Sequence, residues 1–158
     1  MPEFKQHLNQ AKKNIEFLRD INNISEQYYD WQVTTCFYTA LHIINAHLAK
    51  YNLHYNTHVE VARALNFAVA QSVSKVSPEC FVAYRTLQNL SRKARYLSDP
   101  SSKTYIQVYE VHLSKAIGHL DTVITYFSKK YSDISFPICE IKCDSLKGSQ
   151  LTNFKKIS

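Results

Sequence analysis

The stretch from Trp31 to Ala49, WQVTTCFYTALHIINAHLA, decides the fold of this chain. It contains no Asp, Glu, Lys or Arg and is long enough to span a bilayer. However, Gln32, His42 and His47 are costly in hydrocarbon, and the apolar residues recur with a helical period on two faces. The stretch therefore predicts the central, buried helix of a bundle and no membrane segment.

Helical patterns also lie on both sides of this stretch. Before it, apolar residues recur at intervals of three and four over residues 4–21, which predicts a first amphipathic helix. After it, Thr57 and Glu60 have the spacing of a capping box. We expect them to begin a short third helix that reaches Ala68.

Two more helices are expected further along the chain. Ser77 followed by Pro78 is typical of a helix start, because Ser caps the first turn and Pro tolerates the first helical position. The chain is therefore predicted to be all-α, an up-and-down bundle of four or five helices. The apolar stripes of the last two helices include Tyr84, Leu87, Leu90 and Ala94, and then Tyr109, Leu113, Ala116, Leu120, Val123 and Phe127.

The pattern changes after Tyr131. Residues 134–143 read as extended chain, and Pro137 excludes a central strand because it lacks the N–H that such a strand needs. We expect residues 1–131 to form the helical bundle and residues 132–158 an extended C-terminal tail. The tail is expected to lie over the bundle, with pairing to a second subunit as the alternative.

Composition narrows the possible classes of protein. The chain has 158 residues, 45% of them hydrophobic, which fits one globular domain. Two Gly are few for a fold that depends on phosphate loops or many tight hairpins. Nineteen Lys and Arg against thirteen Asp and Glu give a formal charge of +6, which permits an acidic partner such as nucleic acid.

The chain start and the cysteines favour the cytoplasm. The first residues, MPEFK, lack the basic and apolar regions of a secretory signal. Cys36 and Cys80 fall within helical patterns, where buried thiols of a reducing compartment are expected. Cys139 and Cys143 are four residues apart with no second pair, which is a poor zinc signature. We therefore expect no metal and no cofactor.

A first group of candidate site residues forms a predicted polar cleft. Tyr38 and His42 are four residues apart on one helix face, where His42 is suited to act as a general base or to bind phosphate. The alternative for His42 is a histidine at the core edge whose neighbours satisfy it. His58 and Arg63, near the start of the third helix, are placed to bind a phosphate. Asp30 completes this predicted cleft.

A second group lies on the predicted fourth helix and is basic. Arg85, Arg92 and Arg95 follow one another at intervals of seven and three, so they fall along one side of the helix. Tyr84 and Tyr96 have rings of the kind that stack on nucleic-acid bases. A solvated charged face is the alternative. The predicted nucleic-acid-binding residues are Arg85, Arg92, Lys93, Arg95 and Tyr96.

Several of these segments carry a family resemblance. They are Asp30-Trp31, Phe37-Tyr38, Ala40-Leu41-His42, His58, Arg63, Tyr84, Leu87 and Ser91-Arg92-Lys93-Ala94-Arg95-Tyr96. In this order, the chain from Phe4 to Tyr131 resembles prokaryotic HEPN-domain proteins. The resemblance implies an all-α bundle, often dimeric, found in toxin–antitoxin and other defence systems. Many such proteins cut RNA without a metal, using an Arg followed after four to six residues by a His.

This chain departs from that signature, because none of its arginines is followed by a His at that distance. We therefore expect a cytoplasmic homodimer that binds RNA or a nucleotide-bearing partner through the basic helix, without the nuclease motif. One alternative is a metal-independent RNase that takes His42 and Arg92 from different helices. Another is a scaffold that binds a protein partner through the bundle face or the tail.

Overall fold

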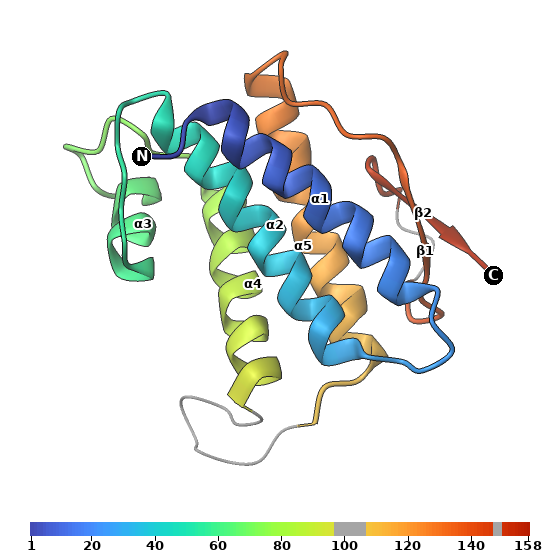
Figure 1. The fold of residues 1–158 in the computed structure, drawn as a ribbon. Coiled ribbons are helices and arrows are strands. Elements are labelled where there is room, and N and C mark those ends of the chain that lie inside the picture. The colour runs from blue at the N-terminus through green and yellow to red at the C-terminus, as the bar shows by residue number, and fades with distance from the viewer. Residues whose placement is uncertain (97–106, 147–149) are drawn as a thin grey trace.

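The computed structural model describes residues 1–96, 107–146 and 150–158, and within them the chain forms five helices and one small sheet (Figure 1). The all-α bundle predicted from the sequence is thereby confirmed. The helices are α1 (Phe4–Asn22), α2 (Tyr29–Ala49), α3 (His58–Leu65), α4 (Pro78–Tyr96) and α5 (Glu110–Lys130), and the strands are β1 (Cys139–Lys142) and β2 (Phe154–Ile157).

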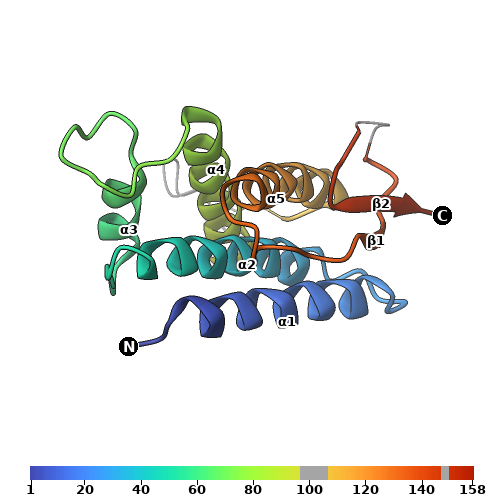
Figure 2. The same cartoon turned by 90° about the horizontal axis from the view of Figure 1, so that it is seen from above.

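Helix α2 occupies the centre of the bundle, as the uncharged stretch from Trp31 to Ala49 predicted. It lies between α1 on one face and the α4–α5 pair on the other (Figure 2). Most of its residues are buried, including Phe37 and Ile44, which are fully enclosed. A helix buried on several sides needs this apolar composition, because few of its positions reach water. Among the described residues, no helix is both long and apolar enough to cross a membrane.

Side-chain caps fix where α3 and α4 begin. The hydroxyl of Thr57 accepts the backbone N–H of Glu60 at 3.2 Å, and the Glu60 carboxylate accepts the backbone N–H of Thr57 at 3.2 Å. Ser77 likewise accepts the backbone N–H of Cys80 at 3.2 Å at the start of α4. The expected extension of α3 to Ala68 is wrong. The Ala68 N–H turns instead to the side chain of Asn66.

The strands lie beside α1, on the side of the bundle away from α3 (Figures 1 and 2). They pair in parallel, with Cys139 opposite Phe154. The side chain of Asn22 closes the outer edge of β1, because it accepts the Lys142 N–H at 2.8 Å and donates to the Lys142 carbonyl at 2.9 Å. This amide thus occupies the place of a further strand. The division of the chain into two domains stays a prediction.

Candidate functional site

Arg95, near the end of α4, lies between two tyrosine rings. Its guanidinium carbon is 5.9 Å from the centre of the Tyr38 ring on α2 and 5.3 Å from that of Tyr96. Its Nη1 donates to the Tyr38 hydroxyl at 3.5 Å, and its Nε donates to the Ser91 carbonyl at 3.4 Å. Tyr96 is 67% exposed. The result is a positioned cation beside an accessible aromatic ring.

His58, the first residue of α3, lies against the same region. Its ring packs edge-on against Phe37 of α2, with ring centres 5.5 Å apart. Burial lowers the pKa of His58 below its ordinary 6.5, and the positive charges of Arg95 and Arg92 lower this pKa further. His58 is therefore neutral near pH 7, and its imidazole offers one N–H donor and one acceptor nitrogen.

These residues form one basic surface, which we call the arginine face. It consists of Tyr38, His58, Arg92, Arg95 and Tyr96. The ion pairs among the described residues are Arg19–Asp20 and Lys50–Asp133, both elsewhere in the chain. No described carboxylate therefore forms an ion pair with either of the two guanidinium groups of the face. Such a surface suits a ligand that brings its own negative charge, such as a phosphate.

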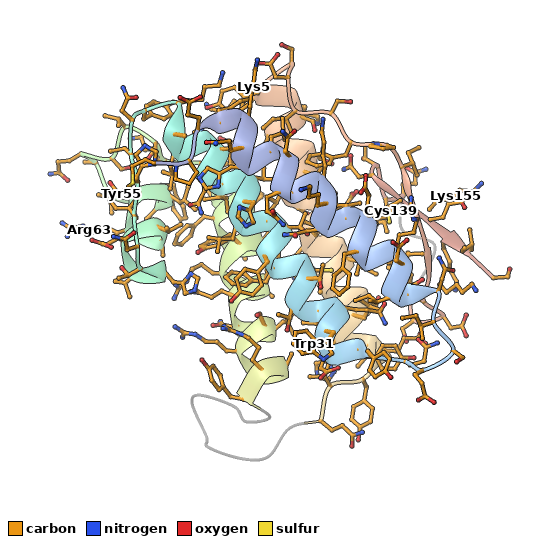
Figure 3. All side chains as sticks on the ribbon, viewed as in Figure 1. Lys5, Trp31, Tyr55, Arg63, Cys139 and Lys155 are labelled. Atoms are coloured by element: carbon orange, nitrogen blue, oxygen red, sulfur yellow. The ribbon has the colours of Figure 1, made fainter. Side chains whose placement is uncertain are left out.

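A shallow depression adjoins the arginine face. It has a volume of about 140 Å³ and lies between the first turns of α2 and the end of α4. Trp31 is 59% exposed, near the start of α2 (Figure 3). We call this feature the Asp30 depression. Its lining residues are Asp30, Trp31, Thr34, Ala94 and Arg95.

The predicted basic residues of α4 point to different partners. Arg85 donates through Nη1 to the side chain of Gln88 at 2.8 Å. The charge of Lys93 helps to lower the pKa of His112 on α5, behind the larger effects of burial and Lys115. Arg92 and Arg95 alone act on His58. The structure therefore separates the predicted nucleic-acid-binding set into three environments.

The predicted polar cleft is also divided. Tyr38 and His58 belong to the arginine face, and Asp30 lines the depression beside it. His42 instead lies with Nδ1 at 3.2 Å from Nδ1 of His7 on α1, and burial lowers the pKa of His42. Arg63 is exposed on the outer side of α3, away from α2 (Figure 3). Of the pair suggested for an RNase, His42 thus contacts His7, whereas Arg92 acts on the pKa of His58, and their pairing stays a prediction.

The expectation that Tyr84 stacks on a base is wrong, because this side chain is fully buried. Its ring stacks on Phe37 with centres 6.0 Å apart, and burial raises its pKa to about 12. Within the described part of the chain, its hydroxyl has no hydrogen-bond partner. Sequence reasoning also missed the contact between His7 and His42, since it joins two helices whose relative rotation no spacing along the chain reveals.

Metal ligands do not gather in the described part of the chain, where no three His, Cys, Asp or Glu side chains are grouped as a possible site. All four cysteines are buried, free thiols. Burial raises the pKa of Cys139 and of Cys143 to about 11, so both remain protonated near neutral pH. The chemistry that the described site offers is that of guanidinium, imidazole, phenol and carboxylate groups.

Comparison with known proteins identifies the bundle. Residues 4–130 match the family model of the HEPN domain. The match begins at the first residue of α1 and ends at the last residue of α5, so it covers the helices and leaves out both strands. Comparisons with curated proteins and with solved structures found no significant match.

Proposed function

The chain belongs to the HEPN domain family, which indicates a function related to RNA or nucleotides, and from this premise we propose that it binds RNA through the arginine face. The observation that carries the proposal is the arrangement of Arg95 between Tyr38 and Tyr96, with Arg92 and His58 beside it. Guanidinium groups bind phosphates with paired N–H donors, and an exposed tyrosine stacks on an unpaired base.

The surroundings of Arg95 support a binding role over a solvated charged surface. An isolated surface arginine samples many side-chain conformations. The rings of Tyr38 and Tyr96 and the Ser91 carbonyl restrict the conformations of Arg95. This positioning reduces the conformational entropy that is lost when a phosphate binds. Single-stranded RNA suits the face best, because its bases are free to stack on Tyr96.

The test is binding of a short, labelled, single-stranded RNA at low salt, measured by fluorescence anisotropy. We expect Arg95→Gln to weaken binding by about tenfold, because it removes a phosphate contact. Arg63→Gln is the matched control, since it removes the same charge from the outer side of α3. Equal affinities of wild type and Arg95→Gln contradict the proposal. So does an equal loss in both variants, which indicates attraction by net charge alone.

RNA cleavage at the same face is the second candidate function. The observation that favours it is His58, a neutral imidazole close to Arg92 and Arg95. Cleavage without a metal needs a base for the 2′-hydroxyl and a cation for the phosphate, and these groups meet both needs. Incubation of the RNA with the protein in the presence of a chelator is the test. Products that persist in His58→Ala contradict this assignment, while products lost in His58→Ala and kept in His42→Ala support it.

The biological setting and the protein partners remain part of this proposal. A role in a toxin–antitoxin or defence system, a homodimer, and a protein partner bound by residues 132–158 are its further elements. Light scattering of the purified protein measures self-association. Deleting the C-terminal segment does not test partner binding cleanly, because Ile141 and Phe154 belong to the buried core. Exposed positions such as Lys155 are the appropriate ones to substitute.

A further inference from the structure

The Asp30 depression contains a carboxylate at the edge of a cationic surface. Asp30 and Thr34 come from the first turns of α2, while Arg95 comes from the end of α4. A carboxylate repels phosphate, so its presence opposes the binding of an RNA backbone at this point. Its position is therefore suited to a different part of the ligand, one that carries N–H donors.

The carboxylate of Asp30 is also unpaired within the described residues. No ion pair or hydrogen bond joins it to Arg95, although both side chains line the same depression. The Arg95 guanidinium is held instead by the Tyr38 hydroxyl and the Ser91 carbonyl. An acceptor and a donor group of opposite charge thus face one small space without satisfying each other, and both remain available to a ligand.

The hydrogen-bond donors of the four bases indicate which base fits the Asp30 depression. Guanine presents two adjacent donors, N1–H and the N2 amino group, which match the two oxygens of one carboxylate. Adenine and cytosine present a single amino group at this edge, and uracil a single N3–H. The exposed indole of Trp31 supplies a stacking surface at the same depression, and Arg95 reaches the neighbouring phosphate.

We propose that the Asp30 depression binds a guanine base of the RNA, with Asp30 accepting hydrogen bonds from its N1–H and N2 amino group. The inference rests on the proposed function, because it assigns base specificity to the RNA that the arginine face binds. Asp30 is thus a specificity-determining residue, and Arg92 and Arg95 supply affinity that is independent of sequence.

Asp30 also has a structural role, which the experiment must distinguish from the recognition of guanine. It lies in the first turn of α2, where a carboxylate stabilises the positive end of the helix. That role alone predicts a change in stability on substitution, with every RNA affected to the same degree. A dependence on the identity of one base is the readout that a structural role does not produce.

The experiment compares three RNAs that are uridine-rich and differ at one position, which holds guanine, inosine or adenine. Inosine keeps N1–H but lacks the N2 amino group, so it removes one of the two expected hydrogen bonds. We expect the wild-type protein to bind the guanine RNA about tenfold more tightly than the adenine RNA, with inosine between them. Asp30→Asn is expected to bind all three alike, because a neutral amide offers a single acceptor oxygen.

The matched control is Asp20→Asn, which removes an exposed carboxylate on α1 that already pairs with Arg19. It is expected to keep the guanine preference of the wild type. Equal binding of the three RNAs by the wild type, with Arg95→Gln still weaker, overturns the guanine site and leaves RNA binding in place. A preference that survives Asp30→Asn also overturns it. Absence of binding to all three RNAs refutes the proposed function and this inference together.

Discussion

Helices α3 and α4, which carry most of the arginine face, and the two strands lie on different sides of the bundle (Figure 1). The two regions use polar side chains in opposite ways. Beside the strands, the Asp121 carboxylate accepts three N–H groups, from the Thr152 backbone and from the backbone and side chain of Asn153. On the arginine face, Arg92 and Arg95 form no ion pair with a described carboxylate. Satisfied polar groups hold the chain together, whereas the unneutralised ones are available to a ligand.

The largest expected effect comes from removing the Asp121 carboxylate beside the strands. Asp121→Ala leaves three N–H groups near the protein interior without their acceptor, so we expect the free energy of unfolding to fall by about 3 kcal/mol. Urea denaturation measures the loss. Asp20→Ala, an exposed carboxylate, is the control and is expected to change it by at most about 0.5 kcal/mol. If folded Asp121→Ala protein binds RNA more weakly, the strand region and the arginine face are not independent in function.

Removing the exposed ring of the arginine face is the next largest change. Tyr96→Ala is expected to weaken RNA binding by about 1.4 kcal/mol, or tenfold, because a base loses its stacking surface. Tyr96→Phe keeps the ring and is expected to bind like the wild type. Stability is expected to stay within about 0.5 kcal/mol in both variants, because the side chain is 67% exposed. If Phe and Ala weaken binding equally, stacking is not the role of this residue.

Lowering the pH is expected to reduce stability and to increase RNA affinity. Burial lowers the pKa of His7 and of His42 below 6.5. The unfolded chain therefore takes up protons first, so stability is complete above about pH 7 and is lost as the pH falls through 6.5 toward the folded-state pKa. RNA affinity is expected to rise over the same range, because His58 becomes positively charged below its lowered pKa.

Denaturation and anisotropy measured at several pH values between about 7.5 and 5 test this prediction. His42→Asn is expected to reduce the pH dependence of stability, and His58→Asn is expected to reduce that of RNA binding. If His42→Asn reduces the pH dependence of RNA binding and His58→Asn reduces that of stability, the two histidines have been assigned to the wrong properties.

The smallest expected effect is a gain in stability with no change in RNA binding. Gly118 lies within α5, and a Cβ added there meets no atom within 4 Å. Gly118→Ala is therefore expected to increase the free energy of unfolding by about 0.5 to 1 kcal/mol, because alanine loses less backbone entropy in a helix. Thermal denaturation measures the gain, and RNA affinity is expected to be unchanged. A destabilised variant would show that the space beside Gly118 is smaller than it is in the structure.

The helices follow from local signals, which is why the sequence predicts them. The stripe before residue 22 and the cap at Thr57 depend on neighbours within one or two turns. The edge of β1 is held by Asn22, which bonds to Lys142 across 120 positions, and no local pattern encodes such a contact. The C-terminal segment was for this reason predicted only as an extended tail.

The sequence predicts the residue types of the candidate site but does not predict which of these residues lie together. Spacing places Arg85, Arg92 and Arg95 along one side of α4, but it does not reveal what each meets. Contact with α2 and α3 selects Arg92 and Arg95, while Arg85 bonds to Gln88 within its own helix. The rotation of α4 against its neighbours depends on the packing of the whole core and is therefore not visible in the pattern of one helix.

The salt dependence of RNA binding shows whether RNA binds at the arginine face. Each phosphate contact on single-stranded RNA contributes about 0.7 to the slope of log affinity against log salt. We predict that Arg92→Gln combined with Arg95→Gln lowers the magnitude of this slope by about 1.4 relative to the wild type, with stability unchanged. An unchanged slope in a folded double variant would contradict RNA binding at the arginine face, because the RNA would then be bound by another surface.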